Sequence, residues 1–145
     1  MNIRVLKAEE LDAALKLVWV VFLEYEAPDY SAEGIYEFRR SIDDPAFLAA
    51  LRTYGAFQEE RVVGVLATRN SGGHIALFFV DPAYQRQGIG RALFEMACKD
   101  TSGNTMTVNS SPYAVPVYHR LGFTDTVAEQ VTNGLRYTPM VCKMH

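Results

Sequence analysis

The feature that most constrains the fold is an apolar segment, residues 75–80, followed by a glycine-containing loop and then a helical pattern. The segment is rich in aromatic and β-branched residues, and Asp81-Pro82 ends it because proline cannot donate a hydrogen bond to a β-ladder. After the loop, apolar residues recur on one face of a helix: Ile89, Ala92, Leu93, Met96 and Ala97. The sequence therefore predicts a buried strand, a loop and an amphipathic helix in succession.

The loop, residues 83–88, has the composition of an anion site. A helix that starts here leaves backbone N–H groups without partners, and the helix dipole adds a partial positive charge to them. Gly88 and Gly90 would let an anion approach the backbone, and Arg86 and Arg91 would add full charges. The same glycines are also consistent with a tight turn that has no ligand.

Two common nucleotide motifs do not fit this loop. A Walker loop needs a Lys-Ser or Lys-Thr pair after its second glycine, and none follows here. A dinucleotide fingerprint needs a third glycine three residues after the second, where this chain has Leu93. The expected phosphate ligand is therefore of another kind.

A different motif matches: Gln85-Arg86-Gln87-Gly88-Ile89-Gly90. It resembles the Gln/Arg-x-x-Gly-x-Gly/Ala signature of the GNAT superfamily of acetyl-coenzyme A-dependent N-acetyltransferases. A second stretch, residues 114–123, is also similar to that family, with an alanine four residues before Tyr118 and then Leu121-Gly122-Phe123. The resemblance is clear over residues 54–123 and weaker before them.

The resemblance implies a mixed α/β fold of GNAT type. Its central sheet would be mostly antiparallel, with one parallel strand pair splayed at the cofactor site and helices on both sides. It also implies that the loop binds the coenzyme pyrophosphate and that the backbone of Phe79 and Val80 pairs with the pantetheine arm. The implied contacts with acetyl-coenzyme A are Phe79, Val80, Gln85, Arg86, Gln87, Gly88, Ile89, Gly90, Arg91 and Ala114, with Asn109 as a polar contact to the coenzyme or the substrate.

The resemblance further makes Tyr118 the general acid that protonates the leaving thiolate. A phenol titrates near ~10 and is protonated at neutral pH, whereas a thiol titrates near ~8.5. The alternative role for this tyrosine is packing in the core. The general base stays open between His74, Glu24 or Glu26 acting through a water molecule, and no base at all.

Composition limits the class of protein. With 145 residues, 49% of them hydrophobic, the chain is expected to form one domain over residues 1–145. Fourteen basic and seventeen acidic residues give a net charge of −3 without a basic tract, which disfavours nucleic-acid partners. The lack of a long apolar run or signal-peptide pattern predicts no membrane partner and a cytoplasmic location. Cys98 and Cys142 match no metal motif and are interpreted as small core residues.

The segment between residues 24 and 44 has an acidic excess. If it lines the groove opposite the coenzyme, its carboxylates would favour a cationic amine as acceptor. The alternative is a solvated helix face. The acids are Glu24, Glu26, Asp29, Glu33, Glu37, Asp43 and Asp44, against Arg39 and Arg40.

The remaining patterns predict the scaffold. Strands are expected at residues 3–7, at 54–58 and 61–68 in an antiparallel meander with 75–80, and at 105–108 parallel to 75–80. A helix is expected from residue 9 to 22, followed by helices capped by Ser31, by Asp44-Pro45 and by Ser111-Pro112, the last ending at Gly122. Residues 127–131 and 135–143 are expected to form a hairpin with an Asn-Gly turn, whose edges would allow a homodimer.

Together these features predict an N-acetyltransferase that moves acetyl from acetyl-coenzyme A to a primary amine, a small molecule or peptide, by direct attack. Transfer of a different acyl group is the nearest alternative. A non-catalytic acyl-coenzyme A sensor and a partner-binding role of the acidic segment are the others.

Overall fold

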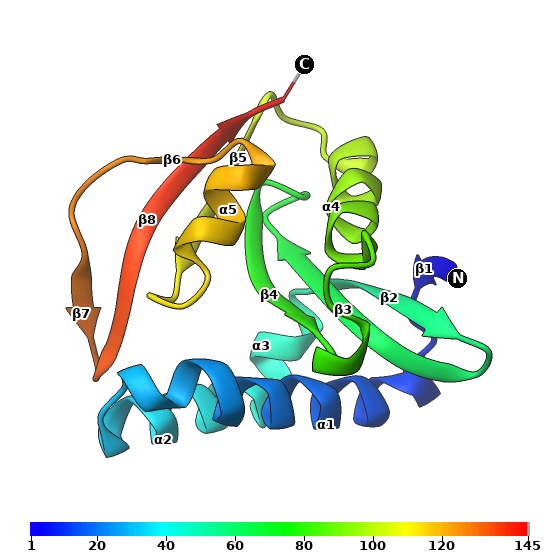
Figure 1. Cartoon of the computed structure of the whole chain (residues 1–145), viewed down its shortest axis with the longest axis horizontal. Coiled ribbons are helices and arrows are strands. Elements are labelled where there is room, and N and C mark those ends of the chain that lie inside the picture. Colours follow the sequence, from blue (N-terminus) through cyan, green and yellow to red (C-terminus); the bar gives the residue numbers. More distant parts are fainter. Residues whose placement is uncertain (145) are drawn as a thin grey trace.

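The chain folds into a sheet with helices on both faces, and the computed structural model describes residues 1–144 (Figure 1). The strands are β1 (Asn2–Val5), β2 (Arg52–Gln58), β3 (Arg61–Arg69), β4 (His74–Val80), β5 (Thr105–Ser110), β6 (Thr124–Asp125), β7 (Gln130–Thr132) and β8 (Leu135–Lys143). The α-helices are α1 (Leu11–Val21), α2 (Ala32–Ile42), α3 (Pro45–Ala49), α4 (Ile89–Asp100) and α5 (Val115–Leu121). Shorter helical turns are η1 (Ala8–Glu10), η2 (Phe22–Glu26), η3 (Ala27–Asp29) and η4 (Pro82–Tyr84). Within residues 1–144, no helix has the length and apolar character needed to cross a membrane.

The strands lie in the order β1-β2-β3-β4-β5-β8-β6, with β7 paired to β8. Strands β1 to β4 are antiparallel neighbours, β4 and β5 are parallel, and β8 is antiparallel to β5. The predicted meander and the predicted parallel pair are both confirmed. The mostly antiparallel sheet with one parallel pair is the fold class that the sequence indicated.

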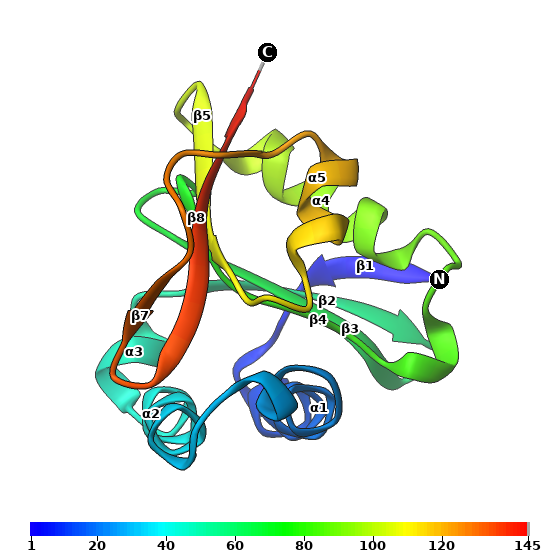
Figure 2. The same ribbon diagram turned by 60° about the vertical axis from the view of Figure 1, so that its left-hand side comes forward.

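Alternation along the strands gives the sheet two buried faces. On β3, Leu66 packs in the core beneath α4, whereas Val65 and Ala67 pack against α1. On β4, Phe78 faces the first core and Phe79 the second. Figure 2 shows α1 and α2 on one side of the sheet and α4 and α5 on the other. Both faces are covered, which explains why β3 and β4 are nearly continuous apolar runs.

The parallel pair separates soon after it begins. Strands β4 and β5 are paired only at His74 with Thr107 and at Ile75 with Val108. Beyond Ile75, β4 keeps its partner β3 on one side and lacks β5 on the other. The carboxyl-terminal half of β4 therefore has a free edge, and η4 and the glycine loop follow directly after it.

The N-terminal helices agree with the sequence signals. The Ser31 hydroxyl accepts a hydrogen bond from the Gly34 amide (3.3 Å) at the start of α2, and Asp44 accepts one from the Ala46 amide (2.9 Å) at the start of α3. The helix predicted over residues 9–22 is present as η1 and α1, and it continues into the π-helical turn η2. Tyr30 is extended after η3, so the helical segment ends at Asp29, one residue after Pro28.

Three predicted boundaries are wrong. The predicted strand over residues 3–7 ends at Val5, because Lys7 is the N-cap of η1 and its amide donates to the Glu10 carboxylate (2.8 Å). Ser111-Pro112 does not start a helix, because Ser111 closes a turn by accepting the Ala114 amide at its hydroxyl (3.2 Å) and its carbonyl (3.1 Å).

Helix α5 begins at Val115 instead, and Pro116 lies in its first turn, where the helix does not need its N–H. Gly122 ends α5 with φ +105°, as predicted. The third wrong boundary is in the hairpin, whose first strand is Gln130–Thr132 rather than residues 127–131. The short strand β6 was not predicted.

Candidate functional site

The loop after β4 has the backbone of an anion site. Gly88 is the N-cap of α4 with φ +81°, and Arg86 also has a positive φ of 65°. The Ala92 amide donates to the Gly88 carbonyl (3.0 Å), so the amides of Ile89, Gly90 and Arg91 precede the first helical donor. These amides and the positive end of the helix dipole face the same region.

Space for a ligand lies directly over this loop. A Cβ atom added at Gly88 would meet nothing within 4 Å, and one at Gly90 would meet the Phe78 ring at 3.5 Å. The loop is held from behind, because the Gln85 side-chain amide donates to the Val80 carbonyl (3.1 Å). The absence of side chains at the two glycines therefore leaves an open cradle.

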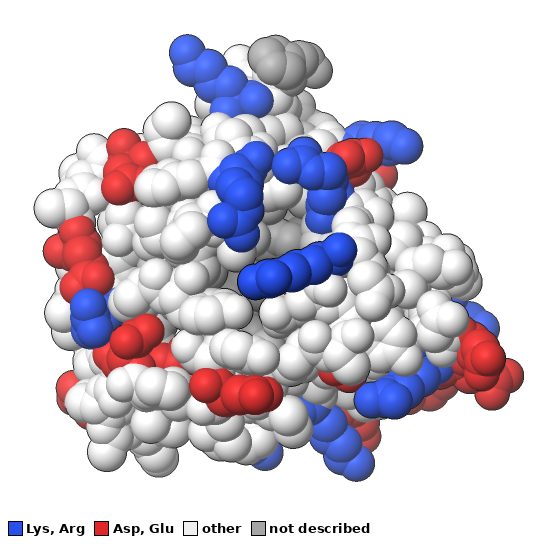
Figure 3. Space-filling model, in the orientation of Figure 1, with Lys and Arg blue, Asp and Glu red and all other residues white. Residues whose placement is uncertain are grey.

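A cavity of about 490 Å³, the loop cavity, extends from this cradle. Its polar wall carries Arg86, Arg91 and Arg120, and the Arg91 guanidinium donates to the Arg120 carbonyl (3.2 Å). Basic side chains surround a hollow on this face in Figure 3. Its other lining residues include Tyr25, Tyr84, Tyr113, Phe79, Val80, Gln85, Gly88, Ile89, Gly90, Ala114 and Val117. The site has local positive charge although the chain is acidic overall.

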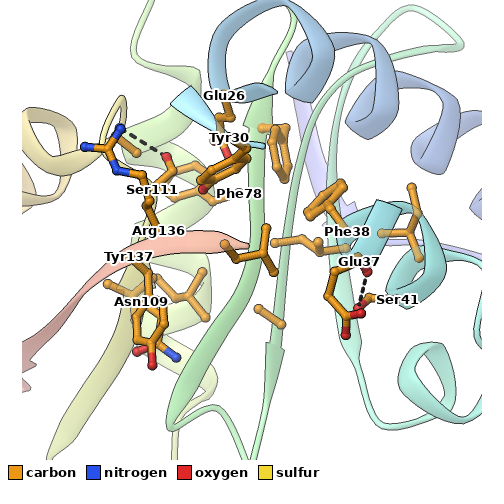
Figure 4. A pocket seen from close by; sticks show the side chains of 18 of the residues that line it. Glu26, Tyr30, Glu37, Phe38, Ser41, Phe78, Asn109, Ser111, Arg136 and Tyr137 are labelled. Carbon is orange, nitrogen blue, oxygen red and sulfur yellow. Dashed lines mark hydrogen bonds between the residues drawn. The ribbon is translucent and has the colours of Figure 1, made fainter. Parts of the chain in front are cut away.

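A second cavity of about 360 Å³, the strand cavity, lies on the other side of the free edge of β4 (Figure 4). Residues of η2, α2, β4, β5 and β8 line it. The side chains of Glu26 and Tyr30 lie at one end, and Asn109 and Tyr137 lie at the other (Figure 4). This cavity lacks the cluster of arginines that marks the loop cavity.

The two cavities share part of their lining. The shared residues are Glu26, Phe78, Phe79, Ala114 and Tyr118. A ligand in the loop cavity and a second ligand in the strand cavity would therefore meet beside a carboxyl group and a phenol. We call these five residues the junction.

Tyr118 is the buried polar group at the junction. Its ring packs edge-on against Phe78 (5.9 Å between centroids) and Phe123 (5.3 Å), and the residue is only 5% exposed. Burial raises the pKa of Tyr118 above its ordinary value, and the nearby charge of Glu26 raises this pKa further. The phenol therefore keeps its proton at neutral pH.

Glu26 is the titratable group at the junction. Burial raises the pKa of its carboxyl to about 7, with a smaller raising effect from Asp29 and an opposing hydrogen bond with Ser111. The carboxyl thus changes charge close to neutral pH, as a general base needs to. Its position follows from η2, where the Ala27 amide donates to the Phe22 carbonyl five residues earlier.

The other predicted base candidates lie elsewhere. His74 starts β4, its Nδ1 bonds to the Thr107 hydroxyl (2.8 Å), and it lines neither cavity. Burial and then the charge of Arg69 lower the pKa of His74 to about 4. Glu24 is exposed and also lines neither cavity.

Most of the predicted coenzyme contacts line the loop cavity. Two do not: Asn109 lines the strand cavity, and Gln87 is exposed and lines neither cavity. Of the acidic residues between positions 24 and 44, only Glu26 and Glu37 line the strand cavity, and Glu37 is paired with Arg40. Most of the acidic residues of this segment therefore do not line the site.

Sequence reasoning missed several lining residues. Tyr25 and Tyr113 pack together (5.0 Å between ring centroids) and line the loop cavity. Arg120 is the third arginine in the lining of this cavity, beside Arg86 and Arg91. Arg120 follows Tyr118 within the second motif, so the motif could have identified it as a site residue. No sequence pattern identifies the tyrosine pair, because η2 and the turn after β5 meet only in the folded chain.

Residues 26–144 match the family described as an acetyltransferase (GNAT) domain, which is most of the chain. The chain belongs to the GNAT acetyltransferase family. This confirms the family that the two sequence motifs indicated, and an acyl-coenzyme A-dependent acyltransferase is the class of enzyme to which this GNAT domain belongs. No curated protein matches it in sequence.

Solved structures share the fold of this GNAT domain. A GCN5-related N-acetyltransferase from Rhodopseudomonas palustris is 22% identical with a TM-score of 0.83, covering 98% of this chain and 94% of that one. The PaiA N-acetyltransferase from Thermoplasma acidophilum, solved in complex with coenzyme A, is 18% identical with a TM-score of 0.72, covering 99% of both chains. FeeM, an N-acyl amino acid synthase from uncultured soil microbes, is 18% identical with a TM-score of 0.73, covering 99% of this chain and 90% of that one.

Proposed function

We propose that this GNAT domain is an N-acetyltransferase that transfers the acetyl group of acetyl-coenzyme A to a primary amine by direct attack in a ternary complex. The observation that carries the proposal is the junction, where two cavities meet beside Glu26 and Tyr118. In this proposal the loop cavity holds the coenzyme and the strand cavity holds the amine.

The residues of the loop cavity fit the coenzyme. The open cradle at Gly88 and the amides of α4 suit a pyrophosphate, and Arg86, Arg91 and Arg120 supply countercharge. The free edge of β4 suits a pantetheine arm that adds like a strand, although the Val80 carbonyl already accepts the Gln85 amide. The Thermoplasma neighbour, which holds coenzyme A, supports the same choice of coenzyme.

The chemistry needs one acid and one base. The thioester of the coenzyme supplies an acyl carbon that an amine can attack. The Tyr118 phenol is protonated and would donate its proton to the departing sulfur. A Glu26 carboxylate oxygen would take the proton of the amine, directly or through a water molecule, and it replaces Glu24 and His74 as the proposed base.

The position of the cysteines favours direct attack. Neither Cys98 nor Cys142 lines the loop cavity or the strand cavity. A covalent acyl-cysteine intermediate would need a thiol at the junction.

The acetyl group is the expected acyl group. A different acyl group is the alternative that a panel of acyl donors would detect, and FeeM is described more generally as an N-acyl amino acid synthase.

Calorimetric titration with acetyl-coenzyme A tests the proposal first. We expect micromolar binding to the wild type, no binding to a variant that carries Arg86→Glu and Gly88→Glu, and unchanged binding to Gly103→Ala. Gly103 is a suitable control because a Cβ there would meet no atom closer than 3.8 Å. Release of coenzyme A thiol that depends on an added amine would support the enzyme. Binding without such release for any amine would favour a non-catalytic sensor.

A further inference from the structure

Two glycines bring α2 and the β7–β8 turn into backbone contact. A Cβ added at Gly34 would overlap the Gly134 carbonyl, and one added at Gly134 would overlap the Gly34 amide and the Ser31 hydroxyl. Gly34 lies inside α2, where glycine destabilises a helix by about 1 kcal/mol relative to alanine. The close approach explains why a glycine occupies this position. We call this contact the glycine clasp.

A polar contact reinforces the clasp. The Arg136 guanidinium on β8 donates to the Asp29 carbonyl of η3 (3.3 Å). Figures 1 and 2 both place the tip of the β7–β8 hairpin against α2. The hairpin is therefore held to α2 at the clasp and to η3 through Arg136.

The clasp bounds the strand cavity. Residues of α2 and β8 form walls of this cavity, and β4 forms another. Because backbone touches backbone at the clasp, the gap between α2 and the hairpin tip is closed on that side of the cavity. A volume of about 360 Å³ suits a small molecule.

The lining also selects by charge. Arg136 is the one basic residue that lines the strand cavity within the described part of the chain, and it is already bonded to both carboxylate oxygens of Glu129 (3.1 and 3.2 Å). A carboxylate on the acceptor would therefore be buried without a free cation. The lining also includes Phe38, Leu77 and Leu135, which suit an apolar body.

We infer that the acceptor is a small primary amine on an uncharged, largely apolar body, held in the strand cavity behind the glycine clasp. The lining disfavours amino acids with a free carboxylate, and the small volume and the closed side at the clasp disfavour the termini of proteins. This inference rests on the proposed function, because it names the acceptor of the same site.

A panel of matched amines tests the charge selection. The panel is 2-phenylethylamine, phenylalaninamide, phenylalanine and a tetrapeptide with N-terminal phenylalanine, with rates expressed per concentration of unprotonated amine. We expect turnover of the first two and a kcat/KM for phenylalanine at least about 100-fold below that of its amide, because a buried carboxylate lacks a partner. Equal values for phenylalanine and its amide, or a preference for the tetrapeptide, would overturn the inference.

Variants of the clasp test the geometry. Gly34→Ala is expected to raise KM for 2-phenylethylamine about tenfold by displacing the hairpin. It should leave the Kd of acetyl-coenzyme A unchanged, and Gly103→Ala should change neither constant. Circular dichroism would establish that Gly34→Ala is folded, and Gly134→Ala offers a second route to the same displacement.

Failure of this inference and failure of the proposed function give different results in these experiments. Unchanged KM in both folded clasp variants would overturn the role of the clasp, and loss of acetyl-coenzyme A binding by the wild type would overturn the proposed function itself.

Discussion

At the scale of residues, Glu26 and Tyr118 have complementary protonation states. Burial raises both pKa values, but the ordinary values differ, so the carboxyl titrates near neutral pH and the phenol stays protonated. One environment therefore provides a base and an acid at the same pH. Both groups lie at the junction, where the two cavities meet.

Tyr118→Phe is expected to lower kcat by roughly 100-fold or more, because the leaving thiolate loses its proton donor. The ring contacts with Phe78 and Phe123 remain, so the Kd of acetyl-coenzyme A should stay near the wild-type value. Steady-state kinetics beside calorimetry measures both quantities. Tyr36→Phe is the matched control, since Tyr36 is 68% exposed. An unchanged kcat would leave Tyr118 with a packing role only.

The activity should depend on pH through Glu26. Its carboxyl is charged, and able to accept a proton, only above a pKa of about 7, so kcat/KM should rise through pH 7 with a break at that value. Glu26→Gln should remove the break and lower kcat/KM at pH 8. A break that persists in the variant would show that another group titrates.

The raised pKa of Glu26 also affects the stability of the fold, and this effect has the opposite direction with pH to its effect on kcat/KM. Folding raises the pKa of Glu26 from an ordinary 4.5 to about 7, so the folded state holds more protons than the unfolded state between these values. The contribution of Glu26 to the free energy of unfolding should therefore fall as the pH rises from 4.5 to 7, opposite in sign to the contribution of His74, whose pKa folding lowers. Urea titrations of the wild type and Glu26→Gln should give a difference in the free energy of unfolding, wild type minus variant, that falls as the pH rises over this interval, and a difference that does not change with pH would argue against a raised pKa.

At the scale of elements, two irregular segments shape the site. The π-helical turn η2 places Glu26 at the junction, whereas a continued α-helix would turn successive side chains by about 100° each and point this carboxyl elsewhere. The loop before α4 uses the left-handed residues Arg86 and Gly88 to expose the amides of the helix. Regular sequence patterns predict neither the π-helical turn η2 nor the direction of its side chains.

Gly88→Ala is expected to weaken acetyl-coenzyme A binding about tenfold, because a residue with a Cβ disfavours the left-handed region by roughly 1–2 kcal/mol. The added methyl group would also enter the cradle, which is open at present. Calorimetry measures this Kd, with Gly103→Ala as control. Binding at wild-type strength would place the pyrophosphate away from Gly88.

At the scale of the whole molecule, the splayed strands divide the sheet at the site. Beyond Ile75, β4 and β5 no longer pair, and the loop cavity and the strand cavity lie along the edge that this separation frees. A ligand bound there would contact both β4 and α5. Such a ligand should therefore stabilise the fold as a whole.

Acetyl-coenzyme A at 100 times its Kd should raise the free energy of unfolding by about 2.7 kcal/mol, as binding to the folded state alone requires. Thermal denaturation with and without the coenzyme measures the shift in Tm. The variant with Arg86→Glu and Gly88→Glu should show none. A shift of equal size in that variant would mean that the coenzyme binds outside the loop cavity.

The sequence predicted the features that local forces decide. Proline after an apolar run, side chains that cap helices and helical spacing gave β4, α2, α3 and α4, because these signals act within a few residues. The same local logic failed at Ser111-Pro112, where a hydrogen-bonded turn competes with a helix start. The motif at residues 85–90 predicted the loop for the same reason, since glycine conformation and helix ends are local properties.

The sequence by itself thus determined most of the sheet strands, the loop after β4 and the family, whereas only the tertiary structure decided the environment of Glu26 and the shape of the strand cavity. Glu26 differs from Glu24 by its burial beside Tyr118 and Ser111, residues far along the chain. The glycine clasp joins positions 34 and 134, and the sequence around either glycine does not predict contact with the other. Burial and backbone contact depend on how distant segments pack, and periodicity along one segment carries no information about them.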